Sequence, residues 1–258
     1  MSTPRVAIVT GAASGIGRAT AELLVERGYG VVAVDVDAER LSWSAGNEMI
    51  AVVAGDVRSE ALNMSAVATA LEIFGRLDAT VLNAGVPASG DLIEGGLDSF
   101  DRSIEINVRA VLLGIRAAVP ALRRFGAGRI SVTASTSGLG GDPSMWAYNA
   151  AKGAVVNLVR AAAVDLAAQD ITVNAVCPGP TETPMTAGIK SAPQRHEDLR
   201  RAIPAQRWGR PDEIAAVIAF LVSAEASFIT GAVIPVDGGI TANTGQFRPA
   251  ERHEENPR

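Results

Sequence analysis

The residues best suited to chemistry in this sequence are a tyrosine and a lysine four positions apart. Tyr148 and Lys152 fall in a segment with helical patterning, where such neighbours lie one above the other. A free phenol has a pKa of about 10, too high for proton exchange at neutral pH, and a nearby ammonium lowers it. Because the chain has only two tyrosines and two lysines, we interpret the pair as a general acid/base rather than an ordinary helix-surface pair.

Ser135 lies 13 residues before Tyr148, just after a predicted strand at 129–133. Its hydroxyl is suited to hold a substrate oxygen beside the phenol. A serine at a strand end is otherwise a common turn residue, and Ser137 is the nearest competitor for the same role. Ser135 is therefore a candidate because of its place in the chain.

A glycine-rich turn at residues 10–17, TGAASGIG, follows the first predicted strand and opens a helix. Glycines there let a pyrophosphate approach the helix N-terminus, where free N–H groups and the helix dipole favour anions. The spacing differs from the common G-x-G-x-x-G, and a tight turn without a ligand is the alternative. The candidate phosphate contacts are Gly11, Ser14, Gly15, Ile16 and Gly17.

Asp35 indicates which nucleotide this turn would hold. It lies 24 residues after Gly11, at the end of the second predicted strand. A carboxylate there accepts hydrogen bonds from ribose hydroxyls and repels the extra phosphate of NADP. Neither Ala13 nor Val36 supplies a cation for that phosphate. The alternative is a turn or capping residue; the sequence predicts NAD.

Further polar residues follow the third and fourth predicted strands. They are Asp56 with Val57, and Asn83 with Ala84 and Gly85. Each taken alone is a common turn sequence. In a parallel sheet both groups reach the carboxyl edge, where ligands bind, so we expect them to line the nucleotide site with Asp35.

Short apolar runs bounded by glycine alternate with helical patterns along the chain, as in strands covered on both faces. We predict one domain over residues 1–242: a doubly wound, seven-stranded parallel α/β sheet of the Rossmann type. The predicted strands are 5–9, 31–34, 49–53, 79–82, 129–133, 171–176 and 232–236, and the predicted helices 16–27, 98–124, 146–168 and 212–224. Residues 186–210 are too long for an ordinary connection and predict a lid. Residues 243–258 form a tail, either frayed or a strap across a neighbouring subunit.

Composition argues against several classes of protein, among them disulfide-stabilised, nucleic-acid-binding and membrane proteins. With 258 residues the chain can bury a full core without disulfides, and its one cysteine, Cys177, cannot form an internal one. A net charge of −5 argues against nucleic-acid or anionic-membrane partners. The apolar start is too short for a signal peptide and no apolar run reaches membrane length, so we expect a cytoplasmic protein. The two histidines, His196 and His253, fall in the lid and the tail, and no metal site is expected.

The motifs together resemble the short-chain dehydrogenase/reductase family in its single-domain form of about 250 residues, over residues 5–241. They are the 10–17 turn, Asp56, Asn83-Ala84-Gly85, Asn107, Ser135, Tyr148-x-x-x-Lys152 and Pro178-Gly179. One departure is Leu82, where many members have a second asparagine.

The resemblance implies that Tyr148 is the general acid/base, Ser135 orients the carbonyl, Lys152 also binds the nicotinamide ribose and Asn107 holds a proton-relay water. It implies cofactor contacts from Pro178, Gly179, Thr181 and Thr183 around the nicotinamide. It implies hydride transfer between NAD(H) and a small secondary alcohol or ketone, in a homotetramer. By analogy, the substrate contacts that the resemblance implies are Val86, Ser137, Met145, Trp146 and Met185.

Two alternatives stay open at this point. One is a 3-oxoacyl-thioester reductase that uses NADPH, against which Asp35 argues. The other is a catalytically silent nucleotide-binding protein, which the presence of Ser135, Tyr148 and Lys152 opposes. Basic lid residues would suit an anionic substrate, although charged surface residues are more often simply solvated.

Overall fold

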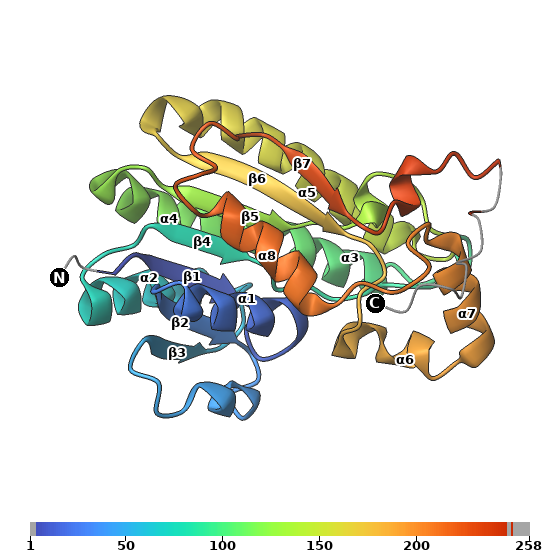
Figure 1. Cartoon of the computed structure of the whole chain (residues 1–258), viewed down its shortest axis with the longest axis horizontal. Helices are drawn as coiled ribbons and strands as arrows, with labels where there is room; N and C mark the ends of the chain where they lie inside the picture. Colours follow the sequence, from blue (N-terminus) through green and yellow to red (C-terminus); the bar gives the residue numbers. More distant parts are fainter. Residues whose placement is uncertain (1–3, 247–248, 250–258) are drawn as a thin grey trace, which may run out of the picture.

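The computed structural model describes residues 4–246 and residue 249. These residues form a seven-stranded sheet in which every neighbouring pair of strands is parallel (Figure 1). The strands are β1 (Val6–Thr10), β2 (Gly30–Asp35), β3 (Ile50–Ala54), β4 (Ala79–Leu82), β5 (Arg129–Thr133), β6 (Thr172–Pro178) and β7 (Val233–Val236). The predicted fold class is confirmed, and each predicted strand is found with its ends shifted by at most two residues.

The strand order β3-β2-β1-β4-β5-β6-β7 places a topological switch between β1 and β4. The chain moves outward from β1 to β3 and then crosses back to β4, which pairs with the other side of β1 through Val9 and Val81. The segments that leave the carboxyl ends of β1 and β4 therefore diverge to opposite faces. Ligands of such sheets bind in the crevice that this divergence opens.

Helices cover both faces of the sheet (Figure 1). Helices α1 (Gly15–Glu26) and α8 (Pro211–Leu221) pack on one face, and α2 (Glu60–Phe74), α4 (Ala110–Phe125) and α5 (Trp146–Leu166) on the other. Along β1, Val6 and Ile8 enter the core under α2, α4 and α5, whereas Ala7 and Val9 enter the core under α1 and α8. This double burial explains why the strands are continuously apolar.

The segment predicted as one helix over 98–124 is helical throughout but not uniform. Helix α3 (Asp98–Ile104) passes through a π-turn, Glu105–Arg109, into α4. The π-turn contains the candidate residue Asn107, which is fully buried. Single π-turns inside helices often occur at functional positions.

Helix α2 was not predicted. Ser59 caps its N-terminus by accepting a hydrogen bond from the Leu62 N–H (3.3 Å), and Gly75 ends it in the left-handed conformation (φ 80°). Its buried face consists of Asn63, Ala66 and Ala70. Because that face holds a polar residue and two alanines, the helical repeat of apolar residues is weak in the sequence. The two capping residues are nevertheless sequence signals for the ends of a helix.

The predicted lid folds into two helices, α6 (Ala187–Lys190) and α7 (Pro193–Ala202), beyond the carboxyl edge of the sheet (Figure 1). Most of the predicted tail, residues 247–248 and 250–258 with His253, lies outside the described residues. Among the helices of the described part of the chain, none has the length and apolar character required to traverse a bilayer.

Candidate active site

The glycine turn after β1 leaves little room for side chains. A Cβ added to Gly17 would lie 2.0 Å from the carbonyl oxygen of Gly11, and Gly11 itself has a φ of 68°. Ser14 precedes α1 in an extended conformation, and its side chain does not cap the helix. The first N–H groups of α1 are therefore available to an anion that approaches the bare backbone.

Asn83 ties the ends of three strands together behind this turn. The Thr10 hydroxyl accepts the N–H groups of Asn83 (2.9 Å) and Ala84 (3.1 Å). The Asn83 amide donates to the Thr10 carbonyl (3.1 Å) and accepts from the Thr133 hydroxyl (3.0 Å). Asn83 thus positions the turn, together with Thr10 and Thr133, which were not among the predicted site residues.

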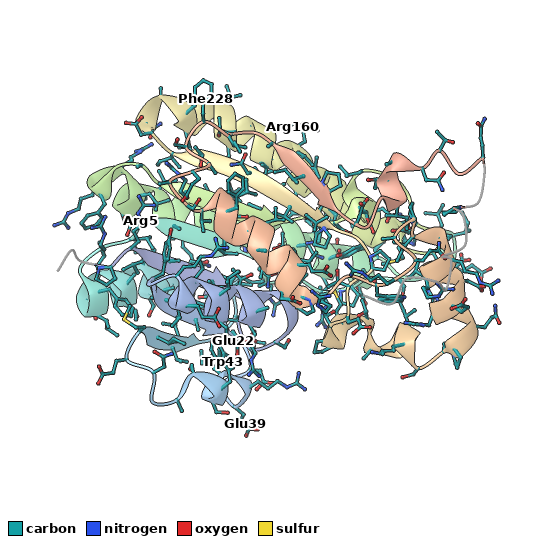
Figure 2. All side chains as sticks on the ribbon, in the orientation of Figure 1. Arg5, Glu22, Glu39, Trp43, Arg160 and Phe228 are labelled. Atoms are coloured by element: carbon teal, nitrogen blue, oxygen red, sulfur yellow. The ribbon has the colours of Figure 1, made fainter. Side chains whose placement is uncertain are left out.

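Asp35 lies at the end of β2 beside the same turn. Its carboxylate accepts the N–H groups of Ala13 (2.9 Å) and Asp37 (3.0 Å). Trp43 adds a contact that the sequence did not predict: its indole N–H donates to the Ala12 carbonyl (3.1 Å), and the Arg18 guanidinium lies over its ring at 5.3 Å. Trp43 lies below α1, close to the turn (Figure 2).

Asp56 and Val57 form the turn between β3 and α2, at the same edge. The exposed Asp56 carboxylate pairs with Arg58 (Nε to Oδ2, 2.8 Å), and this hydrogen bond lowers the pKa of Asp56. The Val57 carbonyl accepts from the Asn63 amide at 2.8 Å. Much of the hydrogen-bonding capacity of these two residues is thus used within their own turn.

Tyr148, Lys152 and Ser135 meet at the carboxyl ends of β5 and β6. The Lys152 Nζ is buried, lies 5.6 Å from the centre of the Tyr148 ring and donates to the Thr133 carbonyl at 2.9 Å. Ser135 is buried directly after β5, and its hydroxyl oxygen accepts the Ser137 N–H (3.1 Å). That bond leaves the Ser135 O–H as a donor, and the Ser135 side chain is a hydrogen-bond partner of the Tyr148 phenol.

The pKa values here are set mainly by burial. Burial raises the pKa of Tyr148 to about 12, while the Ser135 side chain opposes the shift. Burial lowers the pKa of Lys152 to about 8. Removal from water disfavours the charged form of each group, and this outweighs the lowering that the sequence led us to expect for the phenol.

Asn107 and Gly85 lie close to Lys152. The Asn107 amide accepts the Val86 N–H (3.1 Å) and donates to the Val86 carbonyl (3.1 Å) and the Ser103 hydroxyl (3.0 Å). A Cβ on Gly85 would lie 2.7 Å from the Asn107 Oδ1 and 3.5 Å from the Lys152 Nζ. The close approach requires glycine at position 85.

The segment after β6 lies against the glycine turn. Gly179, next to Pro178, packs against Asp237, where an added Cβ would lie 2.8 Å from the Asp237 backbone. The Thr181 hydroxyl donates to the Gly179 carbonyl (2.9 Å). The Thr183 side chain reaches the glycine turn, 3.2 Å from a Cβ built on Gly15. Two residues that the sequence predicted as cofactor contacts, Thr183 and Gly15, therefore face each other.

An acidic residue that the sequence did not single out, Asp142, lies close to Ser137 and Tyr148. The hydroxyl of the buried Ser137 donates to the Asp142 carboxylate. Nearby, Trp146 donates to the Asp91 carbonyl (3.2 Å) and stacks on Phe100 with 5.8 Å between ring centres. An aspartate six residues before Tyr148 was the available signal, but its contact depends on how the intervening loop folds.

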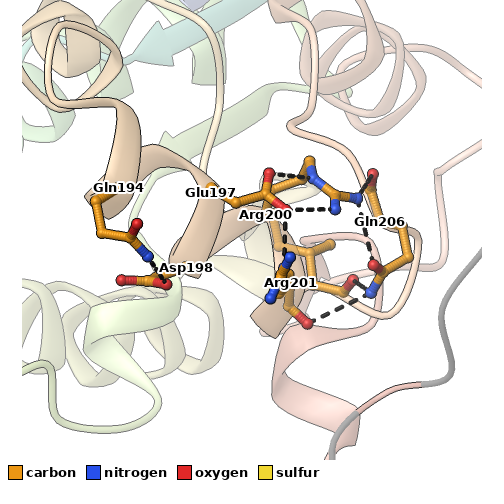
Figure 3. A network of polar contacts seen from close by, with 7 residues as sticks. Gln194, Glu197, Asp198, Arg200, Arg201 and Gln206 are labelled. Carbon is orange, nitrogen blue, oxygen red and sulfur yellow. Dashed lines mark hydrogen bonds and ion pairs between the residues drawn. The ribbon is translucent and has the colours of Figure 1, made fainter.

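The lid carries many cations, and most of them are paired. In α7 the Glu197 carboxylate holds both Arg200 (2.7 Å) and Arg201 (2.8 Å), which keeps the pKa of Glu197 at about 2 (Figure 3). Arg200 also donates to the Gln206 carbonyl (3.1 Å). Nearby, Lys190 pairs with Glu182 (3.4 Å). Within the described residues no group of three or more His, Cys, Asp or Glu side chains is arranged to hold a metal ion.

Known proteins resemble this chain along almost its whole length. A family model described as Enoyl-(Acyl carrier protein) reductase matches residues 11–241. The chain is 42% identical over 244 residues to the cis-4-hydroxycyclohexanecarboxylate dehydrogenase of Sinomonas cyclohexanicum, covering 92% of this chain and 97% of that protein. It is 40% identical over 248 residues to the meso-2,3-butanediol dehydrogenase of Serratia marcescens, covering 94% and 96%.

Solved structures agree with this result. The 3-ketoacyl-(acyl-carrier-protein) reductase of Brucella melitensis, solved as a complex with NADH, superposes with a TM-score of 0.86 at 36% identity, covering 93% of this chain and 100% of that chain. The family match over residues 11–241 and relatives aligned over nearly their full length establish that the chain belongs to the short-chain dehydrogenase/reductase family, as its motifs predicted.

Proposed function

We propose that this oxidoreductase interconverts a small secondary alcohol and the corresponding ketone, with NAD(H) as cofactor and Tyr148 as general acid/base. The observation that carries the proposal is the meeting of Tyr148, Lys152 and Ser135, with the Lys152 Nζ close to Gly85 at the sheet edge. A phenol, a buried cation and a serine hydroxyl that can donate lie together at the crevice where a nucleotide would bind.

In alcohol oxidation Tyr148 accepts the proton of the substrate hydroxyl, and in ketone reduction it returns it. Ser135 donates its O–H to the substrate oxygen and stabilises negative charge there. Lys152 is held by the Thr133 carbonyl (2.9 Å) with its Nζ near the phenol ring, so its charge favours the ionised phenol. Asn107 is proposed to hold a relay water near Lys152.

The residues present fit a dinucleotide. The glycine turn offers bare backbone and an uncapped helix N-terminus to a pyrophosphate. Proposed contacts are Gly11, Ser14, Gly15, Ile16 and Gly17 at the pyrophosphate, Asp56, Val57, Asn83, Ala84 and Gly85 along the sheet edge, and Lys152, Pro178, Gly179, Thr181 and Thr183 around the nicotinamide. When bound, NAD would supply the acceptor for the hydride that leaves the carbinol carbon.

Asp35 supports NAD rather than NADP. Its carboxylate is fixed beside the turn by the N–H groups of Ala13 and Asp37, and it retains lone pairs for ribose hydroxyls. The negative charge would repel a ribose phosphate. Arg18, the cation nearest in sequence to this turn, is engaged with Glu22 (3.0 Å) and with the Trp43 ring.

A second candidate is the reduction of a 3-oxoacyl thioester. It is favoured by the similarity to the Brucella melitensis reductase. The dehydrogenase relatives favour smaller alcohols, but one is named for a carboxylate-bearing cyclic alcohol and the other for an uncharged diol. The relatives therefore leave the charge of the substrate open.

The test is a panel of secondary alcohols and ketones, with a 3-oxoacyl thioester, assayed with NAD(H) and NADP(H). We expect turnover of small alcohols with a preference for NAD, and a loss of that preference in Asp35→Ala. Faster turnover of the thioester with NADPH would establish the second candidate. Absence of turnover with every substrate would refute the proposal.

We also propose that the protein acts as a homotetramer in the cytoplasm. The tetramer is the family expectation, and the long helices α4 and α5 are the surfaces it implies. Cys177 is buried and free, so the fold requires no oxidising compartment.

A further inference from the structure

Asp142 is connected to the proposed catalytic serine by a short chain of hydrogen bonds. Its Oδ2 accepts the Ser137 hydroxyl, and the Ser137 N–H donates to the Ser135 hydroxyl oxygen (3.1 Å). Ser135 and Ser137 are both buried, whereas Asp142 is exposed at the end of this chain. The carboxylate is therefore open to solvent, while it holds the buried Ser137 hydroxyl.

The loop that carries Asp142 is anchored to the helix that carries Tyr148. The Asp142 carbonyl accepts the Asn149 side-chain amide (2.9 Å) and the Met145 N–H (3.3 Å). This places the negative charge near the phenol, and its repulsion of the phenolate contributes to the raised pKa of Tyr148. The charge is thus a fixed part of the site.

The lid does little to offset this negative charge. Glu197 neutralises Arg200 and Arg201, and Glu182 neutralises Lys190. Beyond α7, Glu213 pairs with Arg207 (2.6 Å) and Asp212 with Arg210 (3.0 Å). In the part of the chain that the structure describes, Arg195 is the lid cation that forms no ion pair, and it is exposed.

We propose that Asp142 places a negative charge on the substrate side of the site, restricting the enzyme to uncharged alcohols and ketones, and positions Ser135 through Ser137. This inference rests on the proposed function and extends it to the class of substrate. A carboxylate substrate beside Asp142 faces like-charge repulsion in a partly desolvated site, which an uncharged analogue does not.

The test compares kcat/KM for two substrates of the same ring size, 4-methylcyclohexanol and 4-hydroxycyclohexanecarboxylate, with NAD. We expect wild type to favour the uncharged substrate and Asp142→Asn to shift the ratio towards the carboxylate by about tenfold or more. Asp142→Glu retains the charge and should retain the discrimination. Asp165→Asn is the control for net charge, because Asp165 is exposed on α5 about 25 Å along the helix from Tyr148.

A second readout separates charge from folding. Without the Asp142 charge the phenol ionises more easily, so Asp142→Asn should oxidise the uncharged alcohol faster than wild type at each pH below 8, with the bend that Lys152 sets still near pH 8, whereas Asp165→Asn should match wild type. A wild-type enzyme that prefers the carboxylate, or an Asp142→Asn ratio equal to wild type, would overturn the inference and leave the proposed function intact. No turnover of any alcohol or ketone would overturn both.

Discussion

The surroundings of Tyr148 keep its phenol protonated at neutral pH. Burial raises its pKa to about 12, and Ser135 only partly opposes this. Burial also makes the Lys152 amine easier to deprotonate. In the proposed mechanism the protonated phenol suits donation of a proton to a ketone, and accepting one from an alcohol requires the rarer ionised phenol together with the charged amine.

Replacing Tyr148 by phenylalanine removes the proton-transferring group and preserves the ring. We expect kcat for alcohol oxidation to fall by about 10²–10⁴-fold, while NADH binding, followed by fluorescence titration, stays near the wild-type value. Tyr29→Phe is the matched control, because the hydroxyl of this second tyrosine is buried and donates to the Val222 carbonyl (3.3 Å). Near-normal turnover in Tyr148→Phe would refute the acid/base role.

The two pKa values predict the pH dependence of both directions. Below pH 8 the Lys152 amine is charged and the phenolate fraction grows with pH, so kcat/KM for alcohol oxidation should rise about tenfold per pH unit. Above pH 8 the loss of the ammonium cancels the further gain of phenolate, and the profile levels off. Ketone reduction needs the protonated phenol beside the ammonium and should decline above pH 8. Initial rates in both directions test this; an oxidation rate independent of pH below 8 would contradict it.

At the scale of elements, the sequence predicted most accurately the strands that are buried on both faces of the sheet. Strands such as β1 are buried on both sides, and their unbroken apolar runs reveal them. Helix α2 was not predicted, because its buried face consists of Asn63, Ala66 and Ala70 and therefore gives only a weak apolar period. The π-turn at Asn107 was also unreadable, since it arises where the Asn107 amide binds the Val86 backbone, far away in sequence.

The turn between β1 and α1 provides an element-scale prediction. In Gly17→Ala the new methyl group would lie 2.0 Å from the Gly11 carbonyl and 2.6 Å from the Asn83 amide. The turn must shift, so we expect a loss of about 1–3 kcal/mol in unfolding free energy, measured in urea, and weaker NADH binding.

Gly90→Ala is the control for this substitution, because no heavy atom lies within 4 Å of an added Cβ at Gly90. We expect it to leave both stability and cofactor affinity unchanged. Equal NADH affinity in Gly17→Ala and wild type would show that the turn does not hold the pyrophosphate.

For the whole molecule, motif order predicted that the candidate site residues lie at one edge of the sheet, because a doubly wound sheet brings its strand ends there. Asp35 ends β2, whereas Asn83 and Ser135 follow β4 and β5. What the sequence could not predict was which charges are already paired. The basic lid residues left a contact with an anionic substrate open, and Glu197 holds two of them (Figure 3). The contact of Asp142 with Ser137 depends on the folded loop.

The single chain leaves apolar surface on α5 that the proposed tetramer would cover. Ala150, Ala154, Ala161 and Val164 form an exposed stripe along this helix, with one polar residue, Asn157, at its middle, and Val164 is 80% exposed. Phe228 is fully exposed and projects from the edge of the molecule (Figure 2). Small side chains allow two helices to approach closely, and burial of Val164 in the contact would be favourable.

A charge placed in this stripe should separate the subunits, because an unpaired carboxylate is costly to bury. We expect wild type to have the mass of four chains in light scattering coupled to size exclusion, and Val164→Glu to form smaller species that remain folded by circular dichroism. Met64→Glu is the matched control, since Met64 is 60% exposed on α2, away from the stripe. Wild-type chains that run as monomers, or a Val164→Glu variant that remains tetrameric, would show that α5 is not the contact surface.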